Sequence, residues 1–148
     1  MTTAGSLGPH SGIHEADLGN RSLSTLQQSI PTVAGTAYTV DLWIGRLGQL
    51  AGGDAFSLAV GFAGTTFVNL TALTLPLNSP YAEYSASIIA ASASSPLIIT
   101  YVDQPSYILI DDVSVTAAVP EPAEGLLMLS GLVFVCALTS KARRTQGK

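Results

Sequence analysis

Cysteine, charged residues and lysine are scarce in this sequence. One of the 148 residues is a cysteine, which excludes a disulfide framework and any cysteine-rich zinc site. Only 11% of the residues are charged while 47% are hydrophobic, and a disordered chain would show the reverse. No lysine precedes Lys141, and residues 1–118 carry eight acids against two bases, a net charge of −6. Such a body has little with which to neutralise phosphates, so nucleic acid is not an expected partner.

The remaining residues, 119–148, carry four bases and two acids and contain the most apolar stretch of the chain. As a helix, residues 123–140 would be ~27 Å long, slightly shorter than the ~30 Å hydrocarbon layer. The basic cluster of Lys141, Arg143 and Arg144 follows directly. We therefore expect a short transmembrane helix with a cytoplasmic tail at 141–148 and residues 1–118 across the membrane. The alternative is a buried core helix with a frayed basic tail, which suits the interior of a larger protein.

Three features of this region occur in a characteristic order: Val119-Pro120-Glu121-Pro122, one hydrophobic span, and Lys141-Ala142-Arg143-Arg144. Together they resemble a PEP-CTERM sorting signal, although Glu124 departs from the usual uncharged start of the span. The resemblance implies an exported protein of a Gram-negative bacterium, often one that makes exopolysaccharide. It also implies two partners, the membrane and an exosortase, a cysteine-protease-like membrane enzyme for which Pro120, Glu121 and Pro122 are the recognition residues. The protein would pass through the inner membrane and reach the cell surface or the extracellular space.

The body, residues 1–118, shows alternation of apolar and polar residues, which is typical of half-buried strands. Turn-forming residues separate seven such stretches, at 22–30, 36–44, 55–63, 65–73, 84–90, 97–101 and 107–116. In the last of them, Asp111 falls on the same face as Leu109, Val113 and Val115. No helical periodicity occurs before residue 122. The pattern predicts an all-β fold, an antiparallel β-sandwich or barrel, followed by a proline-rich linker and the C-terminal helix.

The stretches LQQSIPTVAGTAYTVDLWIG, YAEYSASIIAASASSPLIITY and YILIDDVSVT resemble jelly-roll domains of the carbohydrate-binding-module and galactose-binding-like type, over residues 10–117. This resemblance implies a jelly-roll sandwich and polysaccharide as a candidate partner. Related domains open with an Asn-Gly-Phe-Glu-like strand that this sequence does not contain. Residues 1–12 also have no base and no apolar run, which an export signal requires. We therefore expect the sequence to be N-terminally incomplete.

Two pairs of residues are candidate binding residues. Trp43 falls on a polar strand face with Asp41, and an exposed indole beside hydrogen-bonding groups suits the stacking of a sugar ring. The alternative is a tryptophan covered by a loop or by the second sheet. In jelly rolls of this type an aspartate of the last strand often holds a structural calcium, so the resemblance makes Asp111, or Asp112 if a bulge shifts the register, a candidate ligand. The alternative is a carboxylate that accepts backbone N–H bonds at a strand bulge.

Catalytic constellations are not apparent in the sequence. Cys136 lies inside the apolar span, His10 and His14 fall in an expected loop as solvated side chains, and no GxSxG motif occurs. The leading hypothesis is a non-enzymatic exported protein with glycan affinity. The alternative is a structural or adhesive component of the exopolysaccharide matrix that binds no small ligand, and a polysaccharide-active enzyme ranks last.

Overall fold

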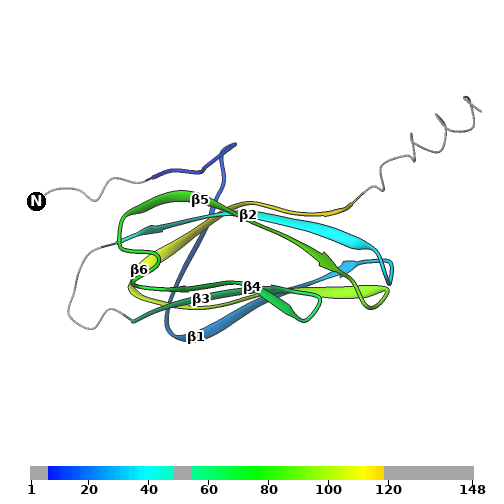
Figure 1. Ribbon diagram of the computed structural model, residues 1–148. Helices are drawn as coiled ribbons and strands as arrows, with labels where there is room; N and C mark the ends of the chain where they lie inside the picture. Colours follow the sequence, from blue (N-terminus) through cyan, green and yellow to red (C-terminus); the bar gives the residue numbers. More distant parts are fainter. Residues whose placement is uncertain (1–6, 49–54, 119–148) are drawn as a thin grey trace, which may run out of the picture. The chain divides into compact units, whose positions relative to one another are not determined.

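The computed structural model describes residues 7–48 and 55–118, and all its regular structure is β-strand. Six strands follow one another along the chain: β1 (Ala16–Pro31), β2 (Ala37–Leu47), β3 (Ala55–Phe62), β4 (Thr65–Thr71), β5 (Ser79–Ile89) and β6 (Ser94–Ala117). Every strand pair is antiparallel. The predicted all-β, antiparallel fold class is confirmed for this part of the chain (Figure 1).

The sheet is folded into two layers because its two longest strands belong to both. The first part of β6 pairs with β3, which pairs with β4, while the second part of β6 pairs with β2, which pairs with β5. β1 follows β6 across both parts, from Ala16 opposite Ile110 to Pro31 opposite Ser94. Figure 1 shows the result, with β2 and β5 in one layer and β3 and β4 in the other.

The length of β6 differs from the prediction. The sequence predicted two strands, at 97–101 and 107–116, separated by a turn at Gln104-Pro105, but a single strand runs through both. The Gln104–Pro105 peptide bond is cis. At this place β6 exchanges its neighbour β3 for β2, so the proline marks a change of layer and not a reversal of the chain.

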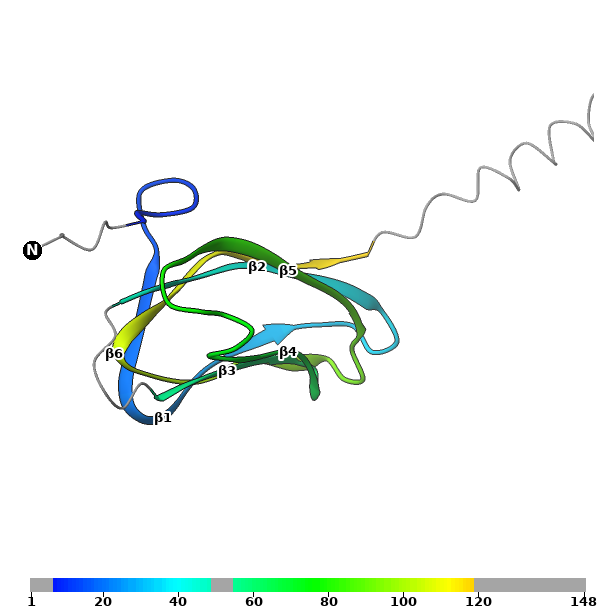
Figure 2. The same ribbon diagram turned by 60° about the vertical axis from the view of Figure 1, so that its left-hand side comes forward.

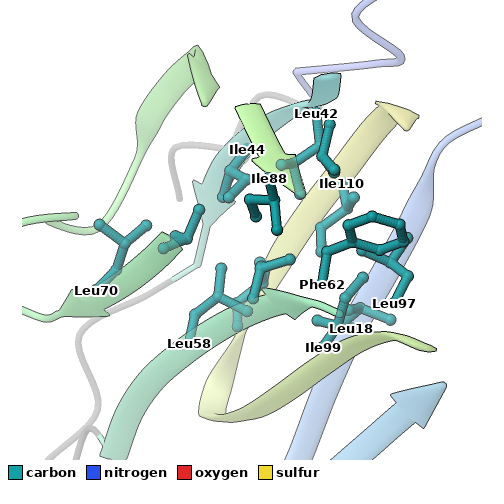
Figure 3. Packing of buried hydrophobic residues seen from close by; sticks show 14 of the residues in the cluster. Leu18, Leu42, Ile44, Leu58, Phe62, Leu70, Ile88, Leu97, Ile99 and Ile110 are labelled. Atoms are coloured by element: carbon teal, nitrogen blue, oxygen red, sulfur yellow. The ribbon is translucent and has the colours of Figure 1, made fainter. Parts of the chain in front are cut away.

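The core lies between the layers and follows the predicted alternation. Every second residue of β2 and of β3 is buried: Tyr38, Val40, Leu42 and Ile44, and Leu58, Val60 and Phe62. Leu97 and Ile99 of β6 join them, as predicted, and Figure 3 shows these side chains converging. Each such side chain stabilises the fold by ~1.5–3 kcal/mol relative to an exposed one.

A bulge near the end of β6 overturns one predicted strand face. Trp43 of β2 pairs with Asp111, but Asp41 pairs with Ser114, so β6 has one extra residue between these pairs. Asp112 takes a positive φ of 49° there. Val115 consequently packs against the core, whereas Val113 remains 45% exposed. The expected grouping of Asp111 with Val113 and Val115 is therefore wrong, because a bulge breaks the period-two pattern.

The predicted sorting signal lies outside the described residues. This applies to the recognition motif at 119–122, the apolar span at 123–140 and the basic tail at 141–148. Within the ranges 7–48 and 55–118 there is no helix of the length and apolarity that a membrane crossing requires.

Candidate functional site

The first candidate site is the outer face of the β2 layer around Trp43, which we call the Trp43 surface. Strand pairing places Trp43 between Glu83 of β5 and Asp111 of β6. The indole is half-buried, because the imidazole of His10 stacks on it at a centroid distance of 3.8 Å and an interplanar angle of 15°. The ring of Tyr81 meets the same imidazole edge-on at 5.6 Å. A loop of the chain therefore covers the tryptophan that the sequence offered for sugar stacking.

Two carboxylates at the β6 bulge hold this loop, the segment of residues 8–15 before β1. His10 Nδ1 lies 2.7 Å from Asp112 Oδ2, and the Ser11 hydroxyl donates to Asp112 Oδ1 at 2.5 Å. The Ser11 backbone N–H donates to Asp111 Oδ2 at 3.1 Å. The hydrogen bonds from Ser11 and then from His10 lower the pKa of Asp112. The loop precedes β1 in Figure 2, and its contacts span about a hundred residues of sequence, which local patterns do not encode.

Asp41, the second predicted sugar contact, is also engaged by the chain. It accepts hydrogen bonds from the Ser85 hydroxyl of β5 at 2.5 Å and from the Ser114 hydroxyl of β6 at 3.3 Å. The structure thus brings Asp41 and Trp43 to one face, as predicted, but neighbouring side chains contact both.

The carboxylates at the bulge, which the sequence offered as calcium ligands, accept hydrogen bonds from the chain itself. Asp111 accepts the N–H of Ser11 and the N–H of Asp112, the latter at 2.7 Å, while Asp112 accepts from Ser11 and His10. Calcium takes six to eight oxygen ligands. Among the residues that the structure describes, no three His, Cys, Asp or Glu side chains lie together in a way that could hold a metal ion. Asp111 therefore has the geometry of a carboxylate that accepts backbone N–H bonds at a strand bulge.

Tyr81 shows how acidic the Trp43 surface is. Its hydroxyl donates a hydrogen bond to the Glu15 carboxylate. Burial raises the pKa of Tyr81, and the hydrogen bond to Glu15 together with the negative charges of Glu15, Asp111 and Asp17 raises it further. This surface thus disfavours additional negative charge.

The second candidate site was not predicted from the sequence. It is a cleft of about 410 Å³, which we call the Tyr107 cleft, and it is lined by Gly19, Asn20, Arg21, Asp103, Gln104, Pro105, Ser106 and Tyr107. It lies where the β1–β6 pairing is interrupted. The register passes from Leu18 opposite Ile108 directly to Asn20 opposite Asp103. Four residues of β6 therefore lack a regular partner in β1, and the cleft forms between the separated strands.

Tyr107 lies against Gly19, the glycine among the described residues that line this cleft. A Cβ atom at Gly19 would stand 2.8 Å from Cδ1 and 2.9 Å from Cε1 of the Tyr107 ring, so no larger residue fits there without moving the ring. The tyrosine is nevertheless 52% exposed. The cleft thus holds an aromatic ring that is supported by backbone and still open to solvent.

Arg21 enters the cleft from a second irregularity of β1. Between the pairs Asn20–Asp103 and Ser24–Tyr101, three residues of β1 oppose one residue of β6. The Asn20 side chain spans this bulge, because its Oδ1 accepts the Arg21 N–H at 2.8 Å and its Nδ2 donates to the Ser24 hydroxyl. The bulge places exposed Arg21 beside the cleft.

A buried ion pair forms the floor of the cleft. Arg46 donates to Asp103 through Nε at 3.1 Å and through Nη2 at 2.8 Å, and both residues are 1% exposed. Nη1 of Arg46 donates to the Leu75 carbonyl at 3.3 Å, and the guanidinium lies 4.0 Å from the Phe56 ring centroid. Sequence reasoning missed this pair, although Arg46 continues the buried period-two series of Val40, Leu42 and Ile44.

Comparison with known proteins finds similarity of fold and no sequence family. No protein-family model matches the chain, and no curated protein does. Solved structures with a similar fold include the EclA C-terminal domain, a sugar-binding protein, at 16% identity and a TM-score of 0.46, with 74% of this chain and 73% of that chain covered. A CBM4 structure matches at 14% identity and a TM-score of 0.43, covering 64% and 61%. The CBM22-1–GH10 modules of a Clostridium thermocellum xylanase, complexed with xylohexaose, match at 18% and 0.47, covering 79% of this chain and 24% of that one.

Proposed function

We propose that the described β-sandwich is a non-catalytic glycan-binding module and that the Tyr107 cleft is its binding site. The observation that carries this proposal is the half-exposed Tyr107 ring seated on Gly19 inside a cleft of about 410 Å³. Ligand sites of small molecules have volumes of roughly 300–1,000 Å³ and combine apolar walls with a few polar groups. The C–H face of a pyranose packs on an aromatic ring, and its hydroxyls need donors and acceptors. Gln104 and Arg21 lie in the cleft and have such groups.

The Trp43 surface supports sugar binding less well than the cleft. His10 already stacks on the indole, and the Asp41 oxygens accept hydrogen bonds from Ser85 and Ser114. A sugar would have to displace the imidazole and compete with these hydrogen bonds. Binding at the Tyr107 cleft requires no such displacement of described residues.

The absence of catalysis is part of the proposal. Among the described residues, Asp103 is the one carboxylate that lines the cleft, and Arg46 binds both of its oxygens. A carboxylate in a bidentate pair with a guanidinium is held ionised, so it is a poor proton donor. Glycoside hydrolysis needs two carboxyl groups, one on either side of the bond, and the part of the cleft that the structure describes has one.

Export and exosortase sorting complete the proposed function and rest on the sequence of residues 119–144. Processing by an exosortase would leave a mature C-terminus near Pro120–Pro122. Mass spectrometry of the secreted protein is expected to find that end, and recovery of Lys148 on the secreted form would contradict the sorting proposal. This test is independent of glycan binding.

Binding of the full-length chain to a panel of soluble polysaccharides, in a mild non-ionic detergent, tests the binding proposal. Tyr107→Ala should lower affinity about tenfold, the effect expected for an aromatic residue at the centre of a site. Tyr107→Phe keeps the ring and should keep most of the affinity, and Trp43→Phe on the other surface should leave it unchanged. Equal affinity of Tyr107→Ala and the unmodified protein would contradict the proposed site. No binding to any glycan would favour the alternative, a structural matrix component.

A further inference from the structure

We infer that the Tyr107 cleft selects an acidic sugar, a uronate residue whose carboxylate is bound by Arg21. This inference rests on the proposed glycan-binding function and names the ligand class for the same site.

Among residues 7–48 and 55–118 there are two arginines and no lysine. Arg46 is buried and bound to Asp103, so Arg21 is the exposed arginine of this part of the chain. The Arg21 backbone N–H donates to Asn20, but in the described residues no acidic side chain pairs with its guanidinium. Arg21, whose charge has no ion-pair partner among the described residues, therefore lines the cleft.

The Tyr107 cleft differs in charge from the rest of residues 1–118. Residues 1–118 carry a net charge of −6. Among the described residues that line the cleft, Asp103 is the only acid, and it is neutralised by Arg46. Asp41, Glu15, Asp111 and Asp112 gather at the Trp43 surface. The cleft is consequently a locally positive place on a negative protein. Long-range attraction does not favour a polyanion here, so an acidic ligand has to be held by this local contact.

The geometry of the two side chains selects a ring with a carboxylate on it. A guanidinium binds a carboxylate through two parallel N–H···O bonds, which a neutral hydroxyl cannot reproduce. Tyr107, supported by Gly19, offers the flat surface for the sugar ring. The Asn20 side chain bonds the Arg21 N–H and the Ser24 hydroxyl, so the backbone that carries Arg21 is held in place before the ligand arrives. A hexuronic acid residue has both of the required parts.

Polygalacturonate and its methyl ester provide a matched pair of ligands, because esterification removes the charge and keeps the sugar. We expect the full-length chain, in a mild non-ionic detergent, to bind polygalacturonate at least about tenfold more tightly than the ester. Arg21→Gln should abolish this preference, and Arg21→Lys should restore part of it. Gln27→Glu is the matched control, since it also lowers the net charge by one at an exposed position of β1 and should leave binding unchanged. Thermal unfolding of Arg21→Gln should match that of the unmodified chain.

Four other results would each overturn the inference that the cleft selects a uronate. Equal binding of the acid and the ester, with loss of both in Tyr107→Ala, would overturn the inference and leave the glycan-binding proposal intact. Binding of dextran sulfate without binding of polygalacturonate would reject the carboxylate in favour of a sulfate group. Arg21→Gln and Gln27→Glu weakening binding equally would show a general charge effect. No binding to polygalacturonate, dextran sulfate or neutral dextran would remove the proposed function as well.

Discussion

Trp43 and Tyr107 both place an aromatic ring on a strand face that points away from the core, but the two rings differ in how far the rest of the chain covers them. Trp43 is covered by an imidazole at 3.8 Å, whereas Tyr107 is 52% exposed and rests on a glycine. Their electrostatic surroundings also differ, with clustered carboxylates around Trp43 and an arginine, Arg21, in the lining of the cleft that holds Tyr107. An aromatic residue on a polar face is thus available to a ligand only where no distant segment of the same chain covers it.

The largest expected effect concerns the floor of the Tyr107 cleft. Asp103→Asn removes the charge partner of buried Arg46, and breaking a buried ion pair in this way typically costs about 3–5 kcal/mol. Chemical denaturation followed by circular dichroism measures this loss. Asp41→Asn is the matched change on the Trp43 surface, where the carboxylate is half-buried and bound by two serines, and a much smaller loss is expected. Equal losses would mean that the two surfaces do not differ in their dependence on buried charge.

The support of Tyr107 by Gly19 gives the second prediction. Gly19→Ala places a methyl group where the ring now lies, so the ring must move. We expect roughly tenfold weaker glycan binding, comparable to the loss of the ring itself. The fluorescence of Trp43, the chain's single tryptophan, should stay unchanged. Unaltered affinity would show that the position of the ring does not matter to the ligand.

Removing the cover from the Trp43 surface is expected to have a smaller effect on stability. His10→Ala deletes the stacked imidazole and its bond to Asp112, at a cost of about 0.5–1.5 kcal/mol for the aromatic pair. Trp43 should become more accessible to acrylamide quenching, and its emission should shift to longer wavelength. His14→Ala changes an exposed histidine of the same loop and should leave quenching as it was. Unchanged quenching in His10→Ala would disprove the stacking.

The smallest expected effect depends on pH. The pKa of Asp112 is lowered from 3.8 by the hydrogen bonds from Ser11 and His10, so the ionised form is the one that the folded loop binds. The stabilisation is therefore present above pH 3.8 and is lost as the pH falls through the lowered value. Trp43 quenching should rise over that range. Asp112→Asn, which tolerates the positive φ at this position, should show raised quenching already at neutral pH and no step in acid.

The strands could be predicted because alternation of apolar residues reflects burial directly. Residues such as Leu42, Leu58 and Ile99 occupy the core for that reason. Residues 97–101 and 107–116 were predicted as separate strands because Gln104-Pro105 lies between them. A proline indicates a turn from sequence, but here the strand continues through it and only changes layer. The same alternation also indicates a buried position for Arg46, since the residue continues an apolar series.

The candidate sites depend on the pairing register of β6 with distant strands, which cannot be predicted from local sequence patterns. The bulge at Asp112 and the bulge after Asn20 each shift the pairing of β6 with a distant strand. The carboxylates that hold the cover on Trp43 lie at the first of these bulges, and the second places Arg21. The opening at Tyr107 arises from a further interruption of the β1–β6 pairing, between Leu18 and Asn20. Trp43 could be identified as a surface aromatic residue from its strand, but its accessibility depends on His10, which lies far away in the sequence.

The central claim is that glycan binds at the Tyr107 cleft and not at the Trp43 surface, and nuclear magnetic resonance mapping tests it most directly. Titration of the ¹⁵N-labelled chain with a galacturonate oligomer should perturb the backbone amides of Gly19–Arg21 and Ser106–Tyr107. The indole N–H of Trp43, which gives a single signal because the chain has one tryptophan, should not move. Shifts of the Trp43 indole and of the His10 and Ser11 amides, with the cleft signals unmoved, would contradict the account.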